Sequence, residues 1–363
     1  MSSLNEDTLR AVLGGFQDRF LQQDWMSAHC IKAVVVEQKH VRLTLTLPYP
    51  NAIFVPILQA ELTALLDQVW SGVTLELTVE TVIHPRQIQA GLKRLGTVKN
   101  TIAVGSGKGG VGKSTTAVNI AAAWAAQGAR VAILDADIQG PNQPLFLGIP
   151  LATKPAMDEQ SKMQPIWAHG MQSNSMGYLV EADAALVWRG PMVSSAVEQL
   201  FYQTAWEDVD FLIIDLPPGT GDIPLTLAKK LPLTGVVVVT TPQPVSLADA
   251  NRAIAMFDKV NVPVLGVVEN WSYYVCPCCD TKTPLFGEGG GSQLAESWKV
   301  PLLGSLPLES IVRECGDRGT PVVLAEPQST VAAAYHAVAA RLAGELAKRK
   351  KDYSGRMPGV VTE

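Results

Sequence analysis

The sequence predicts an α/β protein in which a mainly parallel sheet, covered by helices, follows a small α+β domain. The second part contains short, continuous apolar runs separated by helical stretches, and the runs begin at Ile102, Val131, Phe211, Val236 and Val264. Such runs are typical of parallel strands buried on both faces. Residues 41–47 instead alternate apolar and polar side chains, which predicts a half-exposed strand in the first part.

Residues 1–84 are expected to form the small domain in the order α-β-β-α-β. The expected elements are a helix that begins at 5–7 and extends to Phe20, strands at 31–37 and 41–47, a helix at 56–70 and a strand at 73–79. Residues 85–100 are basic and patternless, which indicates a linker. The main domain is expected over 101–349, ending in an Ala-rich helix from Thr330 to Arg349, and 350–363 are expected to form a flexible tail.

Composition excludes several classes of protein. The formal net charge is −5, which gives no electrostatic support for binding nucleic acid. No apolar run reaches the roughly 18 residues of a membrane helix, and the N-terminus lacks a secretory pattern. Five cysteines, three of them within 276–279, do not resemble a disulfide framework. We therefore expect a cytoplasmic protein with neither nucleic acid nor membrane as a partner.

Residues 107–115 match the phosphate-binding pattern Gly-x4-Gly-Lys-Ser between a strand and a helix. Glycines let backbone N–H groups surround phosphate oxygens, and the helix N-terminus favours the anion. Lys113 is expected at the outer phosphates, and the Ser114 hydroxyl is expected to bind magnesium. The expected nucleotide contacts are Gly107, Lys108, Gly109, Gly110, Val111, Gly112, Lys113, Ser114 and Thr115.

Lys108 is a second lysine in this loop. Because Lys113 already serves the bound phosphates, Lys108 suggests a charge that reaches the nucleotide of another subunit. Alone, it could equally be a solvated loop residue.

Three carboxylates follow predicted strands: Asp135 and Asp137 after one, and Asp215 after another. Ligands bind at this edge of a parallel sheet. Asp215 is the candidate that holds magnesium through water, and Asp137, which opens a loop, is the candidate that orients the attacking water. Asp135 could support them. Any one of the three could simply end a strand, but the set favours a catalytic site.

Cys276 and Cys279 form a CxxC pair, with Cys278 between them. The spacing leaves a metal role, a redox role and an incidental one open. Zinc sites and iron–sulfur clusters usually need four ligands, so a symmetric dimer sharing two cysteines per chain is the economical metal solution. A thioredoxin-type site would lie at a helix start, whereas this pair follows an aromatic stretch, 270–275, expected as a loop. Cys30 and Cys315 are expected to be buried, small apolar residues.

Several stretches together resemble the Mrp/ApbC proteins, which are ATP-dependent iron–sulfur cluster carriers of the MinD/ParA-like group of P-loop ATPases. They are the segments 105–115, 134–142, 187–192, 215–222, 269–279, 286–291 and 316–321. The resemblance implies a homodimer, ATP and Mg²⁺ as cofactors, and Lys108 acting across the interface. It also implies a 4Fe-4S cluster bridged by Cys276 and Cys279 of both chains, with Asn270 near the adenine. Apo iron–sulfur proteins and cluster-assembly scaffold proteins are the implied partners.

The N-terminal part is similar to the MIP18-related domain often fused to these carriers. It lacks that domain's acidic element and cysteine, and Leu47–Asn51 occupies the equivalent loop, so we expect a docking or regulatory module. The alternative for the whole chain is a MinD/ParA-type positioning switch with a redox or zinc role for the CxxC pair. The absence of a basic amphipathic C-terminal helix and of a basic face counts against it.

Overall fold

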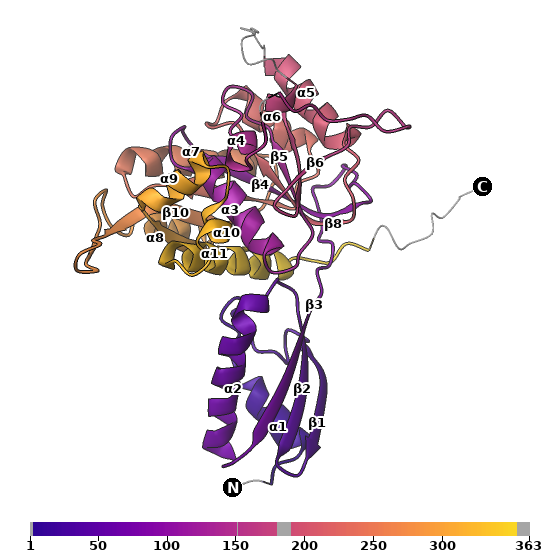
Figure 1. The fold of residues 1–363 in the computed structure, drawn as a ribbon, viewed down its shortest axis with the longest axis vertical. Coiled ribbons are helices and arrows are strands. Elements are labelled where there is room, and N and C mark those ends of the chain that lie inside the picture. The colour runs from indigo at the N-terminus through magenta and orange to yellow at the C-terminus, as the bar shows by residue number, and fades with distance from the viewer. Residues whose placement is uncertain (1–2, 151, 180–189, 354–363) are drawn as a thin grey trace. The chain divides into compact units, whose positions relative to one another are not determined.

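The computed structural model describes residues 3–150, 152–179 and 190–353, and the chain divides into two compact units (Figure 1). The N-terminal unit is Met1–His84 with Ala343–Arg349, and the main unit is Pro85–Leu342 with Lys350–Glu363. Of the segments named above, residues 187–189 and 354–363 lie outside the described residues.

The N-terminal unit has the predicted order of elements. These are α1 (Glu6–Gly14), β1 (Ile31–Glu37), β2 (His40–Leu47), α2 (Val55–Val69) and β3 (Thr74–Thr81). β2 pairs antiparallel with β1 and parallel with β3. The alternation along β2 is confirmed, because Val41, Leu43 and Leu45 are all buried.

The first helix is shorter than predicted: it ends at Gly14, not at Phe20. Two consecutive glycines weaken the helix there. The Asp18 carboxylate then accepts hydrogen bonds from the backbone N–H groups of Phe20 and Leu21, both at 2.8 Å, which stabilise a turn. Phe16 and Phe20 are therefore loop residues whose rings pack against Trp25 and Phe54.

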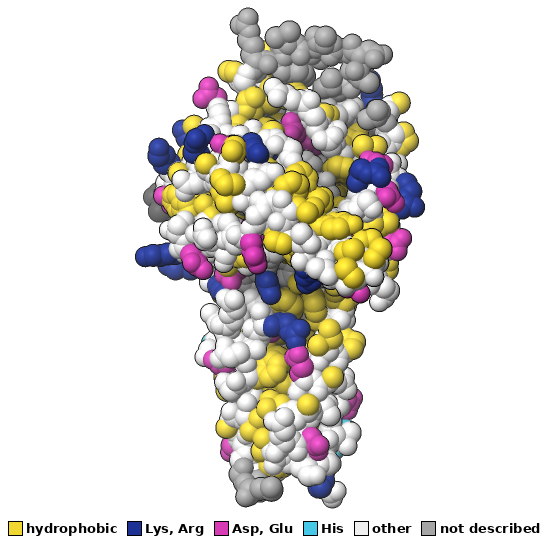
Figure 2. Space-filling view, turned by 90° about the vertical axis from the view of Figure 1, so that its left-hand side faces the viewer, with side chains coloured by type: hydrophobic (Ala, Val, Ile, Leu, Met, Phe, Trp, Pro, Cys, Tyr) yellow, Lys and Arg dark blue, Asp and Glu magenta, His cyan; other side chains and the backbone are white. Residues whose placement is uncertain are grey.

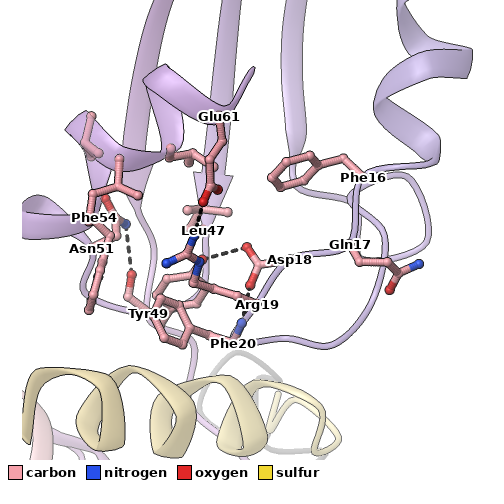
Figure 3. A pocket seen from close by; sticks show the side chains of 13 residues that line it. Phe16, Gln17, Asp18, Arg19, Phe20, Leu47, Tyr49, Asn51, Phe54 and Glu61 are labelled. Atoms are coloured by element: carbon pink, nitrogen blue, oxygen red, sulfur yellow. Dashed lines mark hydrogen bonds and ion pairs between the residues drawn. The ribbon is translucent and has the colours of Figure 1, made fainter. Parts of the chain in front are cut away.

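A cavity of about 270 Å³ lies within the N-terminal unit (Figure 3). Its walls combine aromatic side chains, including Phe20 and Phe54, with an Arg19–Glu61 ion pair. Asp18 also lines it, and its buried carboxylate accepts a hydrogen bond from the Tyr49 hydroxyl (2.6 Å). The loop Leu47–Asn51, which occupies the position of the missing acidic element, contributes Leu47, Tyr49 and Asn51 to the lining of this cavity.

One helical stretch among the described residues, Ala52–Val69, is long and apolar enough to cross a membrane by length and composition alone. This corrects the expectation that no such run exists. The stretch carries Glu61 and Asp67, and apolar helices of water-soluble folds meet the same criterion, so it is weak evidence for a membrane segment.

The main unit is built on a nine-stranded sheet (Figure 1). Its strands are β4 (Val98–Ser106), β5 (Val131–Asp135), β6 (Ile166–Ala168), β7 (Met171–Ser175), β8 (Val209–Asp215), β9 (Gly235–Thr240), β10 (Val264–Val275), β11 (Lys282–Thr283) and β12 (Leu302–Pro307). The order is β11-β10-β9-β4-β8-β5-β7-β6, with β12 also paired to β10. Only the β6–β7 and β10–β11 pairs are antiparallel among these, which confirms the mainly parallel α/β fold.

Helices cover both faces of this sheet. They are α3 (Lys113–Ala125), α4 (Gln143–Phe146), α5 (Gly190–Gln203), α6 (Asp222–Lys230), α7 (Pro244–Lys259), α8 (Gly290–Trp298), α9 (Ser310–Asp317), α10 (Val322–Ala325) and α11 (Thr330–Ala347). On β8, Phe211 stacks on Trp124 of α3, whereas Leu212 and Ile214 join a core with α5, α6 and α7. Adjacent strand residues face opposite sides, so the two sets of helices bury the strands from both directions.

The segment expected as a linker is ordered at both ends. β4 begins at Val98, inside the expected linker, and this residue pairs with β8. Val98 and Asn100 are both buried in the main unit. Residues 85–94 pair with the start of the expected tail: the N–H of Asp352 donates to the Pro85 carbonyl (2.9 Å), and Arg94 forms an ion pair with Asp352 (2.7 Å). The predicted closing helix is confirmed as α11.

Candidate nucleotide site and cysteine hairpin

The glycine-rich loop connects the end of β4 to the first residue of α3, Lys113. Gly112 has φ +81°, in the left-handed region that favours glycine. A Cβ atom on Gly107 would lie 2.1 Å from the backbone of Asp249, so this position admits only glycine without a shift of the chain. The first turn of α3 has no side-chain cap, which leaves its N–H groups suited to an anion.

Four of the predicted site residues, Lys113 included, lie close together. The Lys113 side chain is 6% exposed, and its Nζ forms an ion pair with the carboxylate of Asp215. The same Nζ lies 3.2 Å from Ser114 Oγ and 3.9 Å from Asp137 Oδ2. The hydroxyl and both carboxylates therefore lie around one ammonium group at the C-terminal edge of the sheet.

The buried carboxylates differ in their surroundings. Asp135 and Asp215 lie opposite each other in the β5–β8 register, and both are fully buried. Burial, and then the charge of Asp215, raise the pKa of Asp135 to about 8. Burial also raises the pKa of Asp137, opposed by the charge of Lys113. With one ammonium group beside three carboxyl groups, the site electrostatically favours an additional cation.

Asp135 is a supporting residue in structural terms. Its oxygens accept hydrogen bonds from the backbone N–H groups of Asp137 (3.1 Å) and Gln143 (3.0 Å) and from the Ser175 hydroxyl (3.1 Å). It therefore fixes both ends of the 137–143 segment relative to β5.

Gln143 was missed at the sequence level. It is the first residue of α4, and its Nε2 donates to Asp215 Oδ2 (2.8 Å) and to the Ser114 carbonyl (3.0 Å). The contact with Asp215 joins residues 72 positions apart. Only its place shortly after Asp137 could have drawn attention to it.

Asn270 lies beside the loop, on β10. Its Nδ2 donates to the Val111 carbonyl (2.9 Å), and the residue is 5% exposed. It lines a cavity of about 430 Å³ together with Gly112, Thr115, Phe146, Trp271 and Tyr335. The cavity has the size and mixed polarity of a small-molecule site, and it adjoins the start of α3.

Lys108 lies in the same loop and is half-buried. Its carbonyl accepts a hydrogen bond from Ser106 Oγ (2.9 Å). Among the described residues, no ion pair engages its ammonium group.

The CxxC pair lies at the turn of the β10–β11 hairpin. Residues 270–275, expected as a loop, continue β10, where Tyr274 pairs with Thr283, because aromatic and β-branched residues favour strands. The turn is closed by a hydrogen bond from the Cys276 N–H to the Thr281 carbonyl (3.0 Å). Cys276 is half-buried and Cys279 exposed.

Thr281 also affects the chemistry of this turn. Its side-chain and backbone hydrogen bonds lower the pKa of Cys279, which favours the thiolate that binds metals. Within the described ranges, no three His, Cys, Asp or Glu side chains gather as a metal site. Cys30 and Cys315 are buried, as predicted.

A family model described as the NUBPL iron-transfer P-loop NTPase matches residues 97–343. The chain belongs to this family. A second model, described as an iron-sulfur cluster assembly protein, matches residues 6–77. The resemblance predicted from the motifs is thus confirmed, and the chain is a P-loop NTPase of the iron–sulfur cluster carrier type.

Relatives of this iron-transfer NTPase extend along nearly the whole chain. The iron-sulfur cluster carrier protein of Salmonella typhimurium is 44% identical over 345 residues, covering 94% of this chain and 93% of the relative. The protein of the same description from Synechocystis is 40% identical over 346 residues, covering 94% and 98%.

Solved structures resemble the main unit of this NTPase. A nucleotide-binding protein from Archaeoglobus fulgidus, in complex with ADP, is 37% identical with a TM-score of 0.56, covering 62% of this chain and 88% of that one. The cell division ATPase MinD of Pyrococcus furiosus shares the fold, with a TM-score of 0.51 at 21% identity, covering 67% and 98%.

Proposed function

We propose that this carrier binds and hydrolyses ATP with Mg²⁺, holds a 4Fe-4S cluster at a homodimer interface and transfers it to apo-proteins. The observation that carries the proposal is the continuity of β10, which runs from Asn270 beside the phosphate loop to the CxxC turn. One strand, with an irregularity at Trp271 (φ +56°), thus connects the candidate nucleotide site to the turn that carries the candidate cluster ligands.

The residues around Lys113 fit magnesium and a nucleotide. Gly107–Thr115 would surround the phosphates, and Lys113 would face the outer ones. Ser114 Oγ and, through water, Asp215 would hold magnesium, which supplies charge neutralisation at the phosphates. Asp137, whose Oδ2 lies 3.9 Å from Lys113 Nζ, is the residue that we assign to orienting the attacking water. The Gln143 amide oxygen is buried and has no partner among the described residues, which supports the proposal that this polar wall receives a further polar group.

The cavity beside Asn270 is the proposed adenine site. It adjoins Gly112 and Thr115, so a nucleotide with phosphates in the loop would extend its base towards Asn270 and Trp271. The ADP bound to the Archaeoglobus relative supports nucleotide binding by this fold.

Cys276 and Cys279 are the proposed cluster ligands. Adjacent residues such as Cys278 and Cys279 direct their side chains apart, so the first and last cysteines of the turn are the pair that can face one centre. Since one chain offers two such thiolates and a 4Fe-4S cluster takes four, two copies of the turn would share it. Lys108, unpaired within the described part of the chain, would act on the nucleotide of the partner subunit.

The proposed partners are apo iron–sulfur proteins and cluster-assembly scaffold proteins, in the cytoplasm. On the face shown in Figure 2, Lys and Arg side chains lie among acidic ones without forming a continuous basic surface. This supports the proposal that neither nucleic acid nor membrane is a partner. The N-terminal unit is proposed as a docking or regulatory module.

Anaerobic reconstitution with iron and sulfide tests the cluster site. We expect about four irons per dimer in the wild type and in Cys278→Ser, and loss of the cluster in Cys276→Ser and in Cys279→Ser. A cluster that survives in Cys276→Ser but is lost in Cys278→Ser would show that the wrong pair was assigned. Four irons per monomer would contradict the bridging geometry.

Two further measurements test the ATPase and the transfer. Lys108→Ala should retain ATP binding and lose hydrolysis, and hydrolysis at the wild-type rate would contradict its action across the interface. Cluster transfer to an apo-ferredoxin, with and without ATP, tests the carrier role. An active ATPase that neither loads nor transfers a cluster would instead favour a MinD/ParA-type switch.

A further inference from the structure

Gln143 has an unusual hydrogen-bonding state. The residue is 1% exposed, yet its Oε1 atom has no partner among the described residues. Buried amide oxygens nearly always accept a hydrogen bond, and an unsatisfied one is costly. The oxygen therefore calls for a hydrogen-bond donor beyond the described residues, such as a bound water.

The orientation of this amide is determined by its surroundings. The Nε2 atom faces two acceptors, Asp215 Oδ2 at 2.8 Å and the Ser114 carbonyl at 3.0 Å. Turning the amide over would place its oxygen against both acceptors, with no proton between them. The backbone N–H of Gln143 is held by Asp135 at 3.0 Å, so the residue is anchored at both ends.

The free oxygen lies beside the proposed magnesium ligands. Within one amide group the oxygen and nitrogen are about 2.2 Å apart, so Oε1 is no more than about 5 Å from Asp215 Oδ2. Protein-bound magnesium usually keeps several water molecules, and each of these donates hydrogen bonds outwards. A buried, neutral acceptor at this distance matches such a water.

We propose that Gln143 is a positioning residue of the magnesium site. Its Nε2 holds the Asp215 carboxylate in place, and its Oε1 accepts a hydrogen bond from a magnesium-bound water. The inference rests on the proposed nucleotide site and adds to it a residue that neither the phosphate loop nor the strand-end carboxylates supply. A role limited to packing would affect nucleotide binding equally with and without the metal.

Gln127 provides a matched control. It is also a buried glutamine whose Oε1 has no partner among the described residues. Its Nε2 bonds the Ala123 carbonyl (3.0 Å) and His336 Nδ1 (3.2 Å), neither of which belongs to the nucleotide site. Substituting Gln127 removes a similar set of buried amide contacts and does not affect the proposed metal ligands.

The test measures ADP affinity by calorimetry, in Mg²⁺ and in EDTA, for the wild type, Gln143→Met and Gln127→Met. Methionine keeps the length of glutamine and removes its polar atoms. We expect Gln143→Met to weaken binding about ten-fold in Mg²⁺ and to leave binding in EDTA unchanged. Gln127→Met should alter neither affinity. Loss of the free Mn²⁺ electron paramagnetic resonance signal, titrated in the presence of ADP, should show the same weakening.

Equal affinities of Gln143→Met and the wild type in Mg²⁺ would overturn the inference, and so would an equal loss in Mg²⁺ and EDTA. If Gln143→Met does not fold, Gln143→Asn, which shortens the side chain by one methylene, replaces it with the same expected result. A wild type whose ADP affinity does not depend on Mg²⁺ would contradict the proposed magnesium site itself, and the inference with it.

Discussion

The ammonium group of Lys113 forms an ion pair with the buried carboxylate of Asp215. Asp135 lies opposite Asp215 in the sheet, so the positive charge of Lys113 compensates the negative charge of a cluster of buried carboxyl groups. Lys113, which we assign to the outer phosphates of the nucleotide, thus also stabilises the folded main unit through this ion pair.

Lys113→Ala should therefore affect stability as well as hydrolysis. Removing one partner of a buried ion pair leaves an uncompensated charge, and we expect a loss of about 3 kcal/mol in the free energy of unfolding, measured without nucleotide. Hydrolysis should be abolished, because the outer phosphates lose their positive charge.

The double variant Lys113→Ala/Asp215→Asn separates the two effects. Removing the second charge should restore most of the stability, and hydrolysis should remain absent. Urea unfolding and phosphate release measure these quantities. A double variant as unstable as Lys113→Ala alone would show that the ion pair does not stabilise this edge of the sheet.

Gly107 and Gly109 should respond differently to alanine. A Cβ on Gly107 would lie 2.1 Å from the backbone of Asp249, whereas one on Gly109 would meet nothing closer than 3.9 Å. We expect Gly107→Ala to lose more than about 2 kcal/mol of stability and Gly109→Ala to stay within about 1 kcal/mol of the wild type. Thermal unfolding of both variants tests this, and equal melting temperatures would be inconsistent with the close approach.

His336 should make stability depend on pH. Burial lowers the pKa of this side chain, so the folded chain favours the neutral imidazole. Its contribution is complete above the unfolded pKa of about 6.5 and declines as the pH falls below it, with a slope of at most about 1.4 kcal/mol per pH unit.

His336→Asn removes this titration and keeps an acceptor for Gln127. Urea unfolding between about pH 5.5 and 7.5 should therefore show a smaller loss of stability on acidification in the variant. Identical slopes for the two proteins would exclude His336 as a source of the pH dependence.

A chain starting at Pro85 should retain nucleotide and cluster binding. The main unit contains all the proposed ligands, and residues 85–94 belong to it through Gln89, which bonds Ala228 and Leu233, and through Arg94. A chain starting at Gly96 should be less stable, since it lacks these contacts. Calorimetry with ADP and iron analysis compare the two, and loss of the cluster in the longer one would assign a direct role to the N-terminal unit.

The local parts of the site were predictable from the sequence. The loop 107–115 is contiguous, and Asp135, Asp137 and Asp215 each end or follow an apolar run, so their meeting at one sheet edge follows from parallel pairing. Gln143 was not predictable, because its function depends on a contact with Asp215 that only the folded chain creates.

The strands that were missed have a different explanation. β7 (Met171–Ser175) is fully buried, although Gln172, Ser173 and Asn174 are polar. Each of these side chains has internal partners, such as the Asn174 amide with Thr204 Oγ1 at 2.7 Å. Hydrophobic patterns cannot reveal a strand whose burial depends on hydrogen bonds formed in three dimensions.

The length of β10 has a consequence for the distance between the two sites. Cys276 lies six positions beyond Asn270, which spans at most about 20 Å, and Trp271 interrupts the extended conformation with φ +56°. The covalent chain therefore sets an upper limit on the distance between Asn270 and Cys276. Two residues inserted between Tyr273 and Cys276, beyond this irregularity, would preserve the alternation of faces and shift the thiols by up to about 6.6 Å. In the proposed homodimer a two-fold axis would apply that shift to both copies, so the insertion should abolish cluster sharing while leaving each nucleotide pocket intact.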